Sequence, residues 1–131
     1  MANGAATQQS WPVTVLVPQQ VYERTRSRHR SGLSAALRSV MGELVRLLKA
    51  DVEQLPAVAG IARGEGLRRA AAYDPAAKAR MTVNIPERML RDIEALNIDK
   101  GVSLIARAAL FVLYERDATV HALQPSRRTG S

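Results

Sequence analysis

The sequence contains no cysteine and few aromatic residues. The lack of cysteine excludes a disulfide framework, a Cys-based zinc site and a thiol nucleophile. Aromatic residues make up 4% of the 131 residues, whereas hydrophobic residues as a whole make up 47% and include many alanines. This composition is typical of a helix-rich globule with a thin core and argues against a disordered chain.

Long hydrophobic runs are also missing. The longest one extends only from Ala108 to Tyr114, whereas a membrane-spanning helix needs about 20 apolar residues. No basic flank followed by a long apolar segment occurs near the N-terminus. We therefore expect no membrane span, no secretion signal and a cytoplasmic location.

Catalytic and cofactor-binding patterns are absent as well. The two histidines, His29 and His121, lack the spacing of metal ligands. No glycine-rich loop ends in Gly-Lys-Ser or Gly-Lys-Thr, and acidic pairs such as Asp92 and Glu94 stand two residues apart, on different faces of a helix. The sequence therefore predicts a protein that is not an enzyme, with no metal and no cofactor.

Acidic residues are few relative to basic ones. The chain has 19 Lys and Arg against 12 Asp and Glu, a net charge of +7 and an isoelectric point near 10.8. The excess lies in residues 11–79 and in the C-terminal tail, because residues 80–117 contain six charges of each sign. An excess of positive charge favours an anionic partner, most commonly nucleic acid.

One pattern occurs twice, 68 residues apart. A short β-branched run ends in proline at residues 13–18 and again at residues 81–86. Each run alternates with period two, so we expect two strands with apolar side chains on one face and polar side chains on the other. The proline cannot continue a strand ladder and suits the first turn of a helix.

Two helices are expected after each strand. They cover residues 19–31 and 34–54 in the first copy, and residues 87–96 and 103–123 in the second. Gly32 and Asn97 are the expected stops of the first helices, and Ser34 and Asp99 the expected caps of the second ones. The second helices are apolar on nearly all sides, which predicts a central position.

These patterns predict a mainly α-helical fold with a single two-stranded antiparallel ribbon, because one strand of each copy must pair with the other. The expected organisation is a flexible arm at 1–10, copy one at 11–55, a linker at 56–79, copy two at 80–123 and a loose tail at 124–131. Both copies would form one compact domain.

Each copy has a strand that ends in proline and then two helices, with a Gly or Asn turn and a Ser or Asp cap between the helices. This order of elements resembles the ribbon-helix-helix family of DNA-binding proteins. The resemblance covers nearly all of residues 80–117 and, in order and spacing, residues 12–48. Most members build the ribbon from two chains, so this chain resembles a tandem pseudodimer. That arrangement is similar to TraY-like conjugation factors and to the overdrive-binding virulence protein of T-DNA transfer.

In this family, alternate strand residues contact DNA bases, and the chemistry of the outward residues agrees. In copy two they are Arg80, Thr82 and Asn84; arginine can bind guanine and asparagine adenine through two hydrogen bonds each. In copy one they include Thr14 and Leu16, of which only Thr14 can hydrogen-bond through its side chain. The two copies cannot contact the same bases, so we expect an asymmetric site.

Phosphate contacts are expected from helix N-termini and from arginines. At the second helix of each copy the candidates are Ser34 and the group Lys100, Gly101 and Ser103. Further candidates are Arg24, Arg26, Arg28 and Arg30, although a spacing of two spreads these four around a helix so that they cannot all face one DNA backbone.

The expected function is site-specific binding of double-stranded DNA, by a DNA-transfer accessory factor or a transcriptional repressor. Protein partners in a nucleoprotein complex and self-association of pseudodimers remain open. The alternative is a protein-interaction module, such as an antitoxin-like protein that binds a partner through its second helices. RNA binding is less favoured because aromatic residues for base stacking are few.

Overall fold

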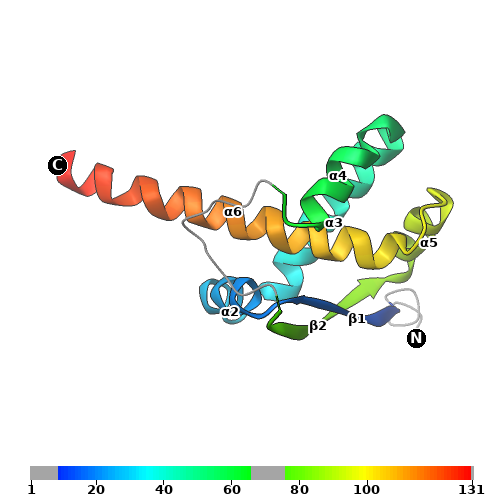
Figure 1. Ribbon diagram of the computed structural model, residues 1–131, viewed down its shortest axis with the longest axis horizontal. Coiled ribbons are helices and arrows are strands. Elements are labelled where there is room, and N and C mark those ends of the chain that lie inside the picture. The colour runs from blue at the N-terminus through cyan, green and yellow to red at the C-terminus, as the bar shows by residue number, and fades with distance from the viewer. Residues whose placement is uncertain (1–8, 66–75, 131) are drawn as a thin grey trace, which may run out of the picture.

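The computed structural model describes residues 9–65 and 76–130, with side chains up to residue 117 (Figure 1). The elements follow in the order β1 (Ser10–Pro18), α2 (Gln19–Arg28), α3 (Leu33–Ala50), the 3-10 helix η1 (Val52–Gln54), α4 (Leu55–Ala62), β2 (Lys78–Pro86), α5 (Glu87–Ala95) and α6 (Gly101–Gly130). The fold is mainly helical with one two-stranded sheet, as predicted. Most of the predicted arm and the Ala-rich centre of the predicted linker lie outside the described residues.

The two strands pair antiparallel within the one chain, as predicted, and form a ribbon along one side of the molecule (Figure 1). Thr14 lies opposite Thr82, so the pairing is centred on two residues 68 positions apart. The predicted alternation is confirmed: the inner face is buried at Val15, Val17, Met81, Val83 and Ile85, and partly buried at Val13.

A proline ends each strand, and a helix begins at the next residue. The first helical residue then donates its backbone N–H across the ribbon: Gln19 to the carbonyl of Ala77 at 2.9 Å, and Glu87 to that of Gln9 at 3.1 Å. These bonds satisfy an amide at each helix start that has no partner within its own helix. They also fix each helix to the opposite strand.

The turns between the helices differ from each other. Asn97 adopts a left-handed conformation with φ of 57°, as expected for the stop after α5. Gly32 does not, because its φ is −143°, and it directly precedes α3. The predicted cap at Ser34 is wrong: α3 begins at Leu33, so Ser34 lies within the first turn, and no side chain caps it.

The helix α6 is longer than predicted. It starts at Gly101, after Lys100 with φ of 52°, and continues to Gly130, so residues 124–130, expected as a loose tail, are helical. Its 30 residues correspond to a length of about 45 Å. Its C-terminal part projects beyond the remaining elements (Figure 1).

The core lies where α3 and α6 pack against each other and against the inner face of the ribbon. In α6, Ile105, Ala108, Ala109 and Leu110 are completely buried, which confirms the predicted central position. The helix α4, at the start of the predicted linker, packs on α6. No helix among the described residues combines the length and the apolar character that crossing a membrane requires.

Candidate nucleic-acid interface

The outer face of the ribbon brings together all five predicted base-contacting residues. The strand register sets Leu16 opposite Arg80, Thr14 opposite Thr82, and Pro12 opposite Asn84. All six side chains are exposed. Leu16 is 53% exposed, so it is not covered by another part of the described chain. The outward face is therefore a continuous strip in which the polar residues of β2 stand beside the mainly apolar ones of β1.

At the centre of the strip, the hydroxyls of Thr14 and Thr82 hydrogen-bond each other, with 2.8 Å between the Oγ1 atoms. One hydroxyl must donate and the other accept, so the pair retains a single O–H for an external acceptor, together with free lone pairs on both oxygens. The two threonines thus act as one polar unit at the midpoint of the ribbon.

The two ends of the strip each combine one hydrogen-bonding side chain with one apolar neighbour. Among the described residues, no hydrogen bond or ion pair involves the side chain of Arg80 or of Asn84. The guanidinium and the carboxamide therefore keep their full capacity for an external partner. Because the partners across the ribbon are Leu16 and Pro12, the two ends present different chemistry.

Two arginines hold the ribbon from the helical layer. Arg38 of α3 donates to the backbone carbonyl of Asn84 at 3.3 Å, and Arg107 of α6 donates to that of Leu16 at 3.2 Å. The two carbonyls belong to positions 68 residues apart. The sequence did not suggest these contacts, because each joins a helix of one copy to the strand of the other and leaves no local pattern.

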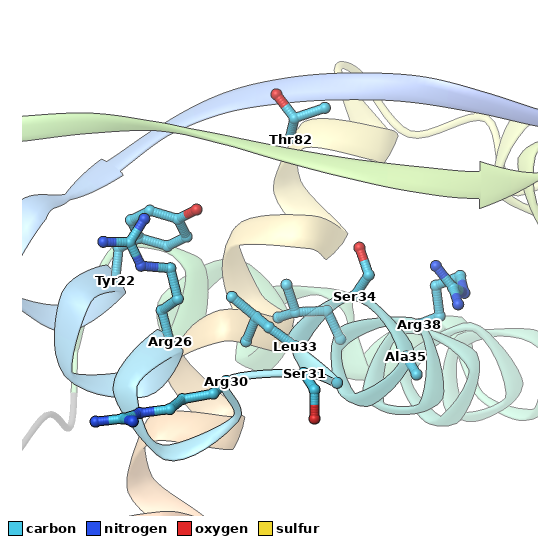
Figure 2. Close-up of a pocket in the computed structure, with 11 residues that line it drawn as sticks. Tyr22, Arg26, Arg30, Ser31, Leu33, Ser34, Ala35, Arg38 and Thr82 are labelled. Atoms are coloured by element: carbon cyan, nitrogen blue, oxygen red, sulfur yellow. The ribbon is translucent and has the colours of Figure 1, made fainter.

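A groove of about 450 Å³ lies beside Thr82, between the ribbon and the N-terminal turn of α3. Figure 2 shows the Ser34 hydroxyl pointing toward the ribbon, with Arg26 on one side and Arg38 on the other. The first N–H groups of α3 have no partner within the helix, and its dipole makes this end positive. The groove therefore combines cationic side chains with amide donors, which suits an anionic group.

The four arginines that follow β1 do not share one surface. Arg26 and Arg30 line the groove, whereas Arg24 donates to the Tyr114 hydroxyl of α6 at 3.5 Å. Arg28 is exposed. The guanidinium of Arg26 also lies 5.4 Å from the centre of the Tyr22 ring, a cation–π distance that orients it beside the groove.

The corresponding N-terminus of α6 is organised differently. Lys100 is exposed and Ser103 is half-buried, but Gly101 is buried and its N–H already donates to the carbonyl of Ile98 at 3.0 Å. The amide of Gly101 is thus engaged within the protein. Of the predicted phosphate-binding residues, the structure brings Arg26, Arg30 and Ser34 into one groove, while Lys100 and Ser103 lie on a separate helix end.

Comparison with protein-family models, curated proteins and solved structures found no match to this chain.

Proposed function

We propose that this protein is a site-specific, non-enzymatic binder of double-stranded DNA that inserts its two-stranded ribbon into the major groove. The observation that carries the proposal is the exposed outer face of the ribbon, where Arg80, Thr82 and Asn84 stand together. Within the described part of the chain, the only side-chain partner that any of them has is the Thr14 hydroxyl, which bonds to Thr82. The major groove of DNA admits a two-stranded ribbon and presents a distinct set of donors and acceptors for each base pair.

Contacts that recur at a spacing of 68 residues support a tandem ribbon-helix-helix pseudodimer. The strand register is centred on Thr14 and Thr82, which are 68 residues apart. The backbone bonds of Gln19 and Glu87 to the opposite strand follow the same offset. So do the two carbonyls that Arg38 and Arg107 bind. These three kinds of contact fit one approximate two-fold arrangement, in which the donors Arg38 and Arg107 are 69 residues apart.

In this proposal the groove beside Thr82 holds a DNA phosphate. Arg26, Arg30 and the N-terminal turn of α3 would supply charge and N–H donors, and phosphate contacts of this kind fix the orientation of a protein on DNA without selecting a sequence. Because the N-terminus of α6 has a different arrangement, we expect the two halves to hold the DNA backbone with unequal strength.

The unlike ends of the outer strip predict an asymmetric target. Arg80 favours guanine, and Leu16 beside it favours contact with a thymine methyl group. Asn84 at the other end favours adenine. The cellular role in this proposal is that of a DNA-transfer accessory factor or a transcriptional repressor in the cytoplasm.

A binding experiment with three nucleic acids tests the proposal. Labelled duplex DNA, single-stranded DNA and RNA, each with randomised sequence, are titrated with the protein at two salt concentrations. We expect the tightest binding to duplex DNA, weakened steeply by salt because bound phosphates release counterions. Equal binding to single strands contradicts the proposal. No binding to any of the three also contradicts it and favours an interaction module.

A further inference from the structure

A second groove, of about 220 Å³, lies between α3 and α5, away from the outer face of the ribbon. Its apolar part is formed by Gly42, Val45, Pro86 and Met89. Its rim carries the charged residues Arg46, Lys49, Arg88 and Asp92. We call this region the Gly42 groove.

The place that corresponds to this groove in the other half of the molecule, between α6 and α2, is filled by side chains. The residue 68 positions after Gly42 is Leu110, and the one 68 positions after Arg46 is Tyr114; both are buried in α6. Tyr114 also accepts a hydrogen bond from Arg24 of α2. The groove thus exists because α3 has a glycine and an arginine where α6 has a leucine and a tyrosine.

The fold does not need a glycine at position 42. Its backbone does not adopt a left-handed conformation. A β-carbon placed there would lie 3.6 Å from Arg46 Nη1 and 3.9 Å from the Met89 methyl carbon, which are ordinary contact distances. Glycine inside a helix is less stable than alanine. Its presence therefore lowers helix stability with no steric reason within the fold, while it keeps the groove open.

The rim of the Gly42 groove has an excess of positive charge. Lys49 pairs with Asp92 at 3.7 Å. Among the described residues Arg88 forms no ion pair, and Arg46 has only a longer-range attraction to Glu43. Two cationic side chains are therefore free to bind carboxylates brought by another molecule.

We propose that the Gly42 groove binds a partner protein through a leucine-sized or tyrosine-sized side chain flanked by carboxylates. The anchor would occupy the place that Leu110 and Tyr114 fill in the other half, and the carboxylates would pair with Arg46 and Arg88. The volume suits a single side chain, because sites that enclose cofactors and other small molecules are larger, at about 300–1,000 Å³. This binding is separate from DNA binding and does not depend on it.

Three synthetic peptides test the proposal on the full chain. The first has one leucine flanked on each side by two glutamates, the second has alanine in place of the leucine, and the third has lysines in place of the glutamates. Affinity is measured by fluorescence anisotropy, and the NMR signal of the Met89 methyl group reports the location. We expect binding of the first peptide with a shift of the Met89 signal, and binding at least about tenfold weaker for the other two, as for loss of an interface anchor.

Two variants and a control locate the contact. Gly42→Leu fills the groove, and Arg88→Glu reverses one rim charge; each should weaken the first peptide by about tenfold or more. The control is Arg63→Glu, which reverses an exposed charge at the residue directly after α4. It should leave the affinity for the first peptide unchanged. Circular dichroism verifies the fold of each variant, and Arg88→Glu retains the test if Gly42→Leu does not fold.

Three outcomes of the peptide experiments overturn the proposal. They are an unshifted Met89 signal at saturating peptide, equal affinities for the three peptides, and unchanged binding in both groove variants. Concentration-dependent dimerisation that Gly42→Leu abolishes also overturns it, because the occupant would then be a second copy of this chain.

Discussion

The glycines at positions 42 and 101 should respond in opposite ways to the same substitution. Gly42 lies inside α3, where an added β-carbon meets only ordinary contacts at 3.6 and 3.9 Å. Gly101 is the buried first residue of α6, where the β-carbon would lie 3.2 Å from both the Ile93 Cγ2 and the Ile98 Cβ. The first site has room for a methyl group, whereas at the second site Ile93 or Ile98 would have to move by a few tenths of an ångström.

The magnitudes follow from these environments. Gly42→Ala should raise the free energy of unfolding by about 0.5–1 kcal/mol, because alanine is favoured over glycine in a helix interior. For a chain of this size that gain corresponds to a rise in Tm of roughly 2–4 °C. Gly101→Ala should lower the free energy of unfolding by about 1–3 kcal/mol, the usual cost of overpacking a core, because Ile93 is buried and the Cβ of Ile98 belongs to the turn itself.

Urea unfolding followed by circular dichroism measures both variants against the wild type. The midpoint should move up for Gly42→Ala and down for Gly101→Ala at an unchanged slope. A loss of stability in Gly42→Ala would refute the argument that the fold has no steric need for glycine there. A gain in Gly101→Ala would show that the turn before α6 is not tightly packed.

Two further predictions concern charge. Replacing Arg26 and Arg30 together by alanine should reduce the slope of log affinity against log salt by about 0.9 for each phosphate that the variant no longer neutralises. The control Arg63→Ala, at the residue after α4, should leave that slope unchanged. An unaltered slope in the double variant contradicts the proposal that the groove beside Thr82 holds a phosphate. The pKa of Glu43 is held below its ordinary value because Arg116 donates two hydrogen bonds to it, so the stability from this pair is present at neutral pH and is lost as pH falls through the lowered pKa. Since both side chains are more than a third exposed, Glu43→Gln should lower stability at pH 7 by only about 0.5 kcal/mol. In acid unfolding experiments that difference should shrink as the pH falls through the lowered pKa of Glu43.

The regular elements could be predicted from the sequence because their signals are local. Alternation at residues 13–17 and 81–85 identified the buried face of each strand, and the prolines at 18 and 86 marked the helix starts. Pairing of the strands followed from the need to satisfy backbone groups. The stop at Asn97 also followed from a local preference, since asparagine tolerates the left-handed conformation.

Features set by tertiary contacts could not be predicted. The bonds from Arg38 and Arg107 to the ribbon join residues 46 and 91 positions apart, and no spacing rule indicates them. The division of the arginine run between the phosphate groove and Tyr114 depends on where α6 lies. The Gly42 groove became visible only when α3 and α6 could be compared in space.

Selection of bound duplexes from a random pool tests the central claim most directly. The wild-type protein should enrich an asymmetric sequence, and Asn84→Ala should relax the preference at one base pair, with a loss of about 1–3 kcal/mol on the selected site. Arg80→Ala should do the same at a different position, and neither variant should change thermal stability, because both side chains point outward. Retention of the wild-type preference by Asn84→Ala and Arg80→Ala, with DNA binding intact, would contradict the claim that the outer face of the ribbon contacts the bases.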